Sequence, residues 1–250
     1  MDSLVAALAD QQGELAKLLE ELPDGRWAAP TRCPGWDVAD VVLHLAQTNE
    51  MAIASTAGRF AEVTARLQAG LGPAVSVDDG AARMVAAERG RPPAEVRARW
   101  AVGATGLVDA LASLAPSTRL PWVAGELSAR TLATTRLAET WIHAGDVAGA
   151  LGLELPPSDR LGPIARLAWR TLPYAFASAG RSLAGPVDFH LTSPSGERWD
   201  FVAEGALSSV SGPAAELCAV AARRVDGAAT SLVTSGPDGP AVLNLVRTYA

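Results

Sequence analysis

Hydrophobic residues recur every three or four positions over most of residues 1–155, which is the pattern of helices that bury one face in a core. The first such stretch runs from Met1 to Leu22 and stops at a Pro-Asp-Gly turn. A second begins after Asp37, which we expect to cap the helix, with the negative charge of Asp40 favoured in its first turn. The spacing therefore predicts two amphipathic helices within the first third of the chain.

Two further long helices are predicted. Residues 69–80 are rich in Gly, Pro and Asp and predict a loop, and a third helix then opens at Pro92-Pro93 and is ended by Pro116 and Pro121. Ser128 is the expected N-cap of a fourth, which stops at Gly152. Four long helices, expected to run nearly antiparallel, favour a four-helix bundle over residues 1–157.

The pattern changes in residues 158–250, where alternating residues predict strands among shorter helices. In chain order we expect a helix over 161–179, strands over 187–191 and 199–202, a helix over 213–224, a strand over 230–234 and a helix over 238–249. The predicted fold is therefore mainly α, a four-helix bundle followed by a small α+β domain.

Composition excludes several classes of protein. The 250 residues are 49% hydrophobic, which is enough for a packed core and excludes intrinsic disorder. A net charge of −6 argues against nucleic acid or an anionic membrane as the main partner. The chain contains neither a secretory leader pattern nor an apolar run long enough for a membrane span, and its two cysteines form no CxxC pair. We therefore expect a reduced, cytoplasmic location.

The candidate chemistry lies on the predicted fourth helix. At 100° per residue, Arg136, Glu139, His143 and Asp146 fall within about 80° of one another. Glu139 and His143 are four positions apart, so an imidazole nitrogen and a carboxylate oxygen can face one divalent metal ion. The alternative is an ordinary solvated helix face. The largely apolar surroundings of this stripe favour a central helix whose polar line faces an internal cavity.

His44 lies on the flank of the second helix's apolar face, where a core histidine with satisfied ring nitrogens is the alternative to a metal ligand. In a four-helix bundle, a histidine on one helix can meet a Glu-x-x-x-His pair on another. Two histidines and one carboxylate leave coordination positions open, as in catalytic zinc sites and also in non-haem iron sites.

Two segments carry a resemblance to a known family. Trp27, Pro30-Thr31 and the run Cys33–Asp37, leading to His44-Leu45, resemble a W-x-x-P-T-x-x-P-G-W-[TD]…H-L pattern, and residues 136–152 resemble R-x-x-E-x-x-x-H-x-x-D-V…A-L-G. Both patterns, in this order, are typical of the mycothiol-dependent maleylpyruvate isomerase-like family within the DinB-like metalloenzyme superfamily.

The resemblance implies a DinB-like bundle in which His44, Glu139 and His143 bind a divalent metal, zinc in characterised members. Asp146 matches a recurrent acidic position, which implies an outer contact to the metal site or to substrate. The C-terminal part is similar to the small α+β domain, described as sterol-carrier-protein-like, that these enzymes append. Mycothiol is the implied thiol cosubstrate.

These observations predict a metal-dependent thiol transferase, or an isomerase that uses the thiol as cofactor, with a small electrophile and a low-molecular-weight thiol as partners. Asp146 and Arg136 are candidate catalytic residues. Arg136 or Arg130 is placed to pair with a substrate carboxylate, the alternative for each being a solvated arginine. Two other functions remain open: a non-catalytic binding or regulatory module, and a metal-dependent hydrolase that uses no thiol.

The remaining conspicuous residues are expected to be structural. Cys33 and Cys218 are predicted to be structural or idle thiols, and His190 an ordinary strand residue. Six tryptophans are predicted to pack in the core: Trp36, Trp100, Trp122, Trp141, Trp169 and Trp199.

Overall fold

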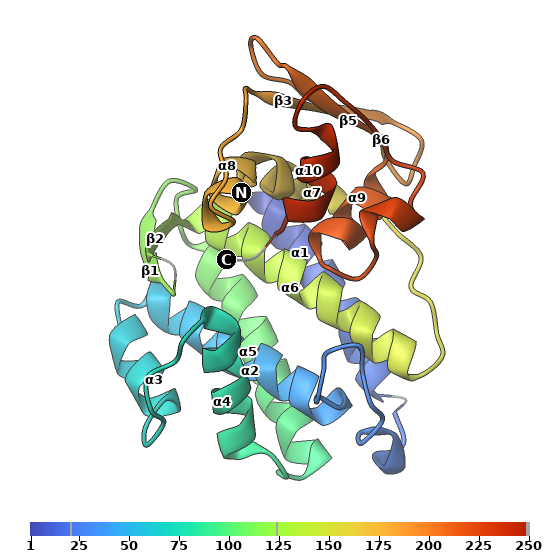
Figure 1. The fold of residues 1–250 in the computed structure, drawn as a ribbon. Helices are drawn as coiled ribbons and strands as arrows, with labels where there is room; N and C mark the ends of the chain where they lie inside the picture. The colour runs from blue at the N-terminus through green and yellow to red at the C-terminus, as the bar shows by residue number, and fades with distance from the viewer. Residues whose placement is uncertain (21, 124, 249–250) are drawn as a thin grey trace. The chain divides into compact units, whose positions relative to one another are not determined.

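The structure, a computed structural model, describes every residue except 21, 124 and 249–250. The chain divides into two compact units, Met1–Leu155 and Pro156–Ala250, which are coloured blue to yellow-green and yellow to red in Figure 1. Among the described residues, no helix combines the length and the apolar character that crossing a bilayer requires.

The first unit is a four-helix bundle with two small additions. Its elements are α1 (Asp2–Glu20), a 3₁₀ turn (Asp24–Arg26), α2 (Val38–Thr56), α3 (Phe60–Leu67), α4 (Val77–Glu88), α5 (Pro93–Ala112), β1 (Arg119–Trp122), β2 (Gly125–Ser128) and α6 (Ala129–Ala150). The long helices α1 and α2 each pack against both α5 and α6. This arrangement confirms the predicted bundle, and it places α2 beside α6.

The two helices that carry the candidate ligands begin where their capping residues predict. The Asp37 side chain accepts a hydrogen bond from the Asp40 amide, and the Asp40 side chain accepts one from the Asp37 amide, which forms a capping box at the start of α2. The Ser128 hydroxyl accepts a hydrogen bond from the Thr131 amide at the start of α6.

Helix α6 is buried on most of its circumference. Its apolar side chains Leu132, Leu137 and Val147 are fully buried. Several of its polar side chains are also buried, among them Arg136, His143 and Asp146. Glycine at position 103 of α5 allows the close approach of α2, because a Cβ there would lie 3.2 Å from Cβ of Asn49. The polar stripe of α6 therefore faces the interior of the bundle, as the sequence predicted, and is not a solvated surface.

Two local predictions in this unit are wrong, and one hairpin was not predicted. The first helix ends at Glu20 and does not reach Leu22. Helix α4 begins at Val77, inside the predicted loop 69–80, because the Ser76 side chain accepts a hydrogen bond from the Asp79 amide and caps it. The antiparallel hairpin of β1 and β2 was not predicted, since its strands are only four residues long.

The second unit is α+β. Its elements are α7 (Leu161–Arg170), α8 (Leu172–Ser178), β3 (Val187–Thr192), β4 (Arg198–Phe201), β5 (Ser208–Pro213), α9 (Ala214–Ala221), a 3₁₀ turn (Gly227–Ala229), β6 (Val233–Ser235) and α10 (Gly239–Leu245). The sheet has the order β4-β3-β5-β6, with β3 and β5 parallel and the other pairs antiparallel.

Two predictions for this unit need correction. The helix expected over 161–179 is two helices, because Thr171 ends α7 and Pro173 lies in the first turn of α8, where a proline is tolerated. Strand β5 was missed, since its sequence, Ser-Ser-Val-Ser-Gly-Pro, has a single β-branched residue. The helical and strand character of the remaining segments is as predicted. The helices α9 and α10 are shorter than expected, β3 is one residue longer, β4 is shifted by one residue and β6 begins three residues late. Residue 249, the expected end of the last helix, lies outside the described residues.

The prediction that six tryptophans pack in the core holds only for Trp100, which is 2% exposed. The other five are partly exposed. Two of them, Trp36 and Trp122, lie against polar side chains of the candidate site, as described below. These two rings therefore contact candidate site residues and do not only fill the core.

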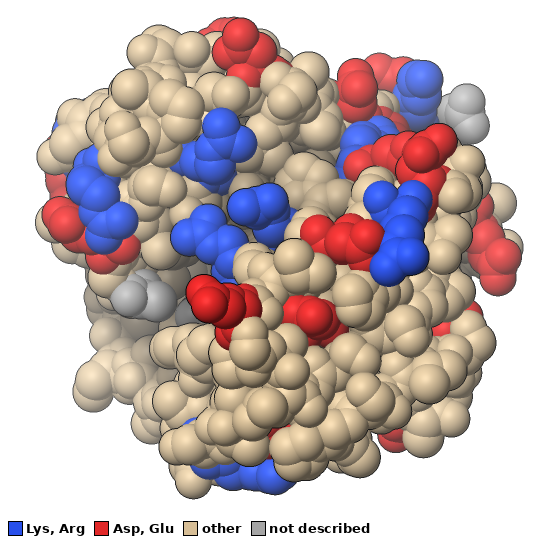
Figure 2. Space-filling view, turned by 90° about the horizontal axis from the view of Figure 1, so that it is seen from above, with Lys and Arg blue, Asp and Glu red and all other residues tan. Residues whose placement is uncertain are grey.

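Charged side chains of both signs are present on the face drawn in Figure 2. Basic and acidic groups lie interspersed across the middle of that face, and residues of other types form most of it. The excess of acidic residues in the composition is therefore not gathered into one acidic surface on this face.

Candidate metal centre

Three predicted ligands from two helices converge inside the bundle. His44 projects from α2, and Glu139 and His143 lie one turn apart on α6. Nε2 of His44 is 3.3 Å from Oε2 of Glu139, and Nε2 of His143 is 3.7 Å from the same oxygen. The two imidazole rings meet edge to face with centroids 5.1 Å apart. The structure thus brings together residues that are 95 positions apart in the chain.

This cluster fits a divalent metal ion. Ligand atoms that bind zinc tetrahedrally at about 2.0–2.1 Å are about 3.3–3.5 Å from one another, close to the separations seen here. The ligand atoms of His44, Glu139 and His143 all lie within 4.8 Å of one another. Two imidazoles and one carboxylate are a common donor set of catalytic zinc sites, and they leave room for a further ligand.

Asp146 completes the environment of His143. Its Oδ2 lies 3.0 Å from Nδ1 of His143, on the side of the ring opposite to the Nε2 that faces Glu139. A carboxylate in this position fixes the tautomer and orientation of a metal-binding histidine. Nδ1 of His44 has no such partner among the described residues, and its ring packs instead against Trp36, with centroids 5.2 Å apart.

Burial and hydrogen bonding shift the ionisation of the cluster in opposite directions. Burial lowers the pKa of His44 below its usual value, although the hydrogen bond with Glu139 opposes this. Burial would also lower the pKa of His143, but its hydrogen bonds with Asp146, Cys33 and Glu139 hold that pKa well above the usual range. Burial would raise the pKa of Glu139, yet hydrogen bonds from both histidines keep it well below the usual value.

Arg136 is buried, so it is not the solvated arginine that was the alternative interpretation. Its side chain is 3% exposed, Nη2 is 3.5 Å from Oε2 of Glu139, and the guanidinium lies over the ring of Trp122 at 5.5 Å. Burial lowers the pKa of Arg136 despite the nearby Glu139 charge. Nε and Nη1 have no hydrogen-bond partner among the described residues. Arg130, the other predicted candidate, is exposed.

Cys33 was predicted to be a structural or idle thiol, but it lies at this site. Its Sγ donates a hydrogen bond to Oδ2 of Asp146 at 3.2 Å and is 3.9 Å from Nδ1 of His143. Cys33, His143 and Asp146 therefore form a second group that could hold a metal. The sequence held a weak signal for this, because Cys33 occupies a variable position within the motif that contains Trp36 and leads to His44.

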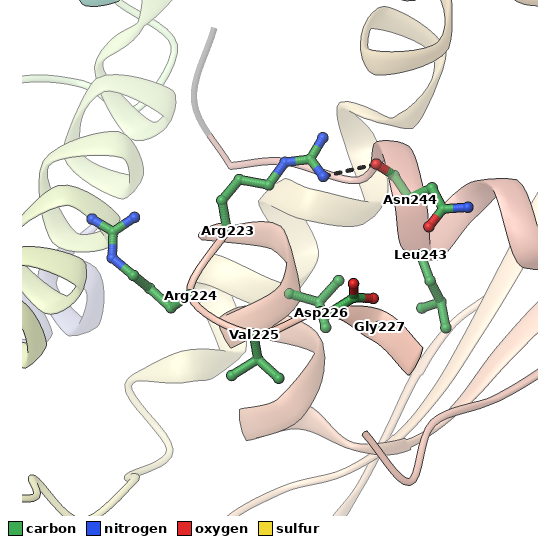
Figure 3. A pocket seen from close by; sticks show the side chains of 8 residues that line it. Arg223, Arg224, Val225, Asp226, Gly227, Leu243 and Asn244 are labelled. Carbon is green, nitrogen blue, oxygen red and sulfur yellow. Dashed lines mark hydrogen bonds between the residues drawn. The ribbon is translucent and has the colours of Figure 1, made fainter. Parts of the chain in front are cut away.

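The second unit contains a separate hollow of about 300 Å³, drawn in Figure 3. Eight residues line it: Val220, Arg223, Arg224, Val225, Asp226, Gly227, Leu243 and Asn244. Arg223 adopts a φ of 59° and donates from Nη1 to the Asn244 carbonyl at 2.7 Å, shown dashed. Arg224 points away from Arg223 in the figure. The predicted site residues are all in the first unit, so none of them lines this hollow.

Comparisons with known proteins identify the family and the fold of this chain. Uncharacterized proteins from two strains of Mycobacterium tuberculosis are each 33% identical over 247 residues, which cover 98% of this chain and 95% of theirs. The crystal structures of a mycothiol-dependent maleylpyruvate isomerase and of its histidine-to-alanine mutant each superpose with a TM-score of 0.62 at 18% identity, covering 96% of this chain and 95% of theirs. The model of the mycothiol maleylpyruvate isomerase N-terminal domain matches residues 8–148. The chain therefore belongs to the mycothiol maleylpyruvate isomerase family, and it shares the fold of the solved enzyme.

Proposed function

We propose that this protein is a divalent-metal-dependent enzyme that joins mycothiol to a small electrophilic substrate, or uses the thiol to isomerise it, in the reduced cytoplasm. The observation that carries the proposal is the convergence of Nε2 of His44, Oε2 of Glu139 and Nε2 of His143 from two helices. Family membership supports the thiol, and the donor set supports zinc as the metal.

In this proposal His44, Glu139 and His143 hold the metal, and Asp146 orients His143 through the hydrogen bond at its Nδ1. A bound zinc ion would keep the thiol of the cosubstrate in its thiolate form at neutral pH. Glu139 supplies the negative charge of the ligand set, and its lowered pKa keeps it ionised. Trp36 covers the rings of both histidines on one side and limits the approach of water.

The reaction forms one bond between the thiol sulfur and an electrophilic carbon. The sulfur supplies the electron pair, and the thiol proton is released to solvent or base. If a leaving group departs from that carbon with its own electron pair, the adduct is the product of a thiol transfer. If instead the carbon belongs to a double bond conjugated to a carbonyl group, the addition breaks the π bond and moves its electron pair to the carbonyl oxygen. After rotation about the resulting single bond that pair re-forms the double bond, and the sulfur departs with the electron pair of the C–S bond. The substrate is then isomerised, and the thiolate regains its proton from solvent or base.

Arg136 supports an anionic group on the substrate. A buried guanidinium whose Nε and Nη1 lack partners among the described residues carries an unfavourable desolvation cost. A carboxylate on the substrate would accept a charge-assisted hydrogen bond from one of these two donors. We therefore assign Arg136 to substrate binding next to the metal ligands.

The test is a conjugation assay with mycothiol and chlorodinitrobenzene, in which sulfur displaces chloride. Protein loaded with zinc should produce the mycothiol adduct, and the same preparation stripped with a chelator should lose this activity and regain it when zinc is restored. Product mass distinguishes the alternatives, because hydrolysis adds water to a substrate and never a thiol. Metal binding without turnover of any electrophile would contradict the proposal and favour a binding module.

A further inference from the structure

We infer that Arg89 is a positioning residue of the metal centre, which it does not touch. Its guanidinium fixes the loop of residues 31–37, and that loop carries Cys33 and Trp36 against the site. The inference rests on the proposed function for the identity of the site that the loop covers. Residue 89 directly follows α4, outside both motifs that carry the family resemblance.

The Arg89 side chain donates three hydrogen bonds, two to the Asp40 carboxylate and one to the Gly35 backbone. Nε donates to Oδ1 of Asp40 at 2.9 Å, and Nη2 donates to Oδ2 of the same carboxylate at 2.6 Å. Nη2 also donates to the carbonyl oxygen of Gly35 at 3.1 Å. A fork of this kind fixes orientation as well as distance, since two parallel bonds share one carboxylate. Arg89 therefore connects the end of α4 to the start of α2 and to the loop before it.

Asp40 transmits this restraint to the end of the loop. Its side chain is 5% exposed, and its carboxylate also accepts the Asp37 amide at 3.3 Å. Gly35 adopts a φ of 76°, in the left-handed region where glycine is favoured, which directs its carbonyl to Arg89 as the chain reverses. Arg89 thus holds residue 35 of the loop directly, and it holds residue 37 through the Asp40 carboxylate.

Internal hydrogen bonds make the loop a single unit. The Thr31 amide donates to the Trp36 carbonyl at 3.0 Å, and the Trp36 amide donates to the Cys33 carbonyl at 3.0 Å. The Thr31 hydroxyl accepts the Cys33 amide at 3.2 Å. Because these bonds join both ends of the loop, a restraint at Gly35 also limits the movement of Cys33 and Trp36.

The other side of the loop faces the metal ligands. The Trp36 ring lies 5.2 Å from the ring of His44 and 6.5 Å from that of His143. Sγ of Cys33 donates to Asp146, the carboxylate that orients His143. A loosened loop would therefore alter the wall of the site and the approach to it, while the ligands themselves stay on α2 and α6.

A simple stabilising ion pair is the competing explanation. Half of the Arg89 side chain is exposed, and exposed ion pairs contribute little to stability. Such a pair would affect only the thermal stability of the fold. The bond to the Gly35 carbonyl distinguishes the two explanations, because only a positioning role couples Arg89 to the order of residues 31–37.

The experiment compares Arg89→Ala and Arg89→Lys with Arg91→Ala. Arg91 is an exposed arginine two positions further along that pairs with Glu88 and Glu95. Hydrogen exchange of the loop amides reports its order, and alkylation by iodoacetamide at fixed pH reports access to Cys33. The chain has only one other cysteine, Cys218, which is fully buried, and mass spectrometry localises the adduct.

Arg89→Ala should accelerate both the exchange of the loop amides and the alkylation of Cys33 by about tenfold or more, the loss expected when charged hydrogen bonds are removed. In Arg89→Lys both rates should lie between those of Arg89→Ala and wild type, since an ammonium cannot reproduce the two parallel hydrogen bonds. In Arg91→Ala both the exchange rates of the loop amides and the alkylation rate of Cys33 should equal those of wild type. All three variants should retain zinc, and in Arg89→Ala the KM for the electrophile should rise more than kcat falls.

If the loop amides of Arg89→Ala exchange and its Cys33 is alkylated at the same rates as in wild type, the inference is overturned, whatever the melting temperature of the variant. If Arg89→Ala does not fold, the same two readouts in Arg89→Lys decide the matter in the same way. The proposed function fails separately, since loss of conjugation or of zinc binding in the wild-type protein leaves the loop measurements interpretable.

Discussion

Oδ2 of Asp146 lies 3.0 Å from Nδ1 of His143, while Nε2 of the same ring faces Oε2 of Glu139 at 3.7 Å. One imidazole therefore lies between two carboxylates, one on the metal-binding side and one behind it. In the proposed metal centre the outer carboxylate would determine how the ring presents its Nε2, so the affinity for the metal would depend on a residue that is not itself a ligand.

Asp146→Asn should weaken zinc binding by about 10–100-fold without abolishing it, because the amide orients His143 less strongly than a carboxylate does. Competition with a fluorescent zinc chelator measures the change. Asp109→Asn, which alters an exposed carboxylate on α5, is the matched control and should bind zinc as wild type does. Equal affinities of Asp146→Asn and wild type would show that Asp146 has no orienting role.

Zinc binding should release a proton at neutral pH. Burial opposes the charged form of His143, but the hydrogen bonds with Asp146, Cys33 and Glu139 outweigh it and raise its pKa well above the usual value. The stability that this proton contributes is present below about pH 6.5 and is lost as the pH rises through the raised pKa. Metal must displace the proton, so zinc affinity should fall as the pH decreases.

Titration calorimetry at pH 7 in buffers of different ionisation enthalpy measures this proton. The heat of zinc binding should vary with the buffer, and the slope should give about one proton released for each zinc ion bound. Heats that do not depend on the buffer would mean that His143 is already neutral before metal binds.

Arg136→Met should raise the KM for an anionic electrophile by about 10–100-fold, the effect of losing a charge-assisted hydrogen bond in a buried site. A neutral analogue, such as the amide of the same substrate, should show little change in KM. Arg130→Met removes an exposed charge six residues earlier, in the first turn of the same helix, and should leave both values unaltered. A similar loss for the charged and neutral substrates would assign Arg136 to maintaining the fold of the site.

Cys33→Ser should leave zinc stoichiometry unchanged, since Sγ of Cys33 already donates to Asp146. Cobalt substitution gives a direct view, because a thiolate ligand produces a sulfur-to-cobalt charge-transfer band. The cobalt-substituted wild-type protein should lack this band until mycothiol is added. The cobalt-substituted Cys33→Ser variant should likewise show the band only after mycothiol is added. A band before thiol addition that Cys33→Ser removes would instead support the group of Cys33, His143 and Asp146 as the metal site.

Much of the bundle could be predicted because its signals are local. Asp37 and Ser128 cap helices whose apolar spacing is regular, and both caps are present. The polar stripe on α6 was also visible, since its neighbours in sequence are almost all apolar. That His44 faces Glu139 depends on how two helices pack, so the sequence alone left it open and only the family resemblance indicated it.

Other features depend on tertiary contacts that no local pattern encodes. Cys33 and Trp36 reach the site because the loop of residues 31–37 is closed by its own hydrogen bonds and by Arg89, a residue more than 50 positions away from either. Strand β5 has little intrinsic strand preference and is held by its pairing with β3 and β6. The division of the expected helix at Thr171 could have been anticipated from Pro173.

The most direct test of the metal centre is the zinc content of purified protein, measured by elemental analysis, in wild type and in a variant that combines His44→Ala with His143→Ala. His190→Ala removes the third histidine, which pairs with Asp200 in the second unit, and serves as the control. Wild type and the control should each bind about one zinc ion per chain, and the double variant close to none. Undiminished zinc in a folded double variant would contradict the assignment of these histidines as ligands.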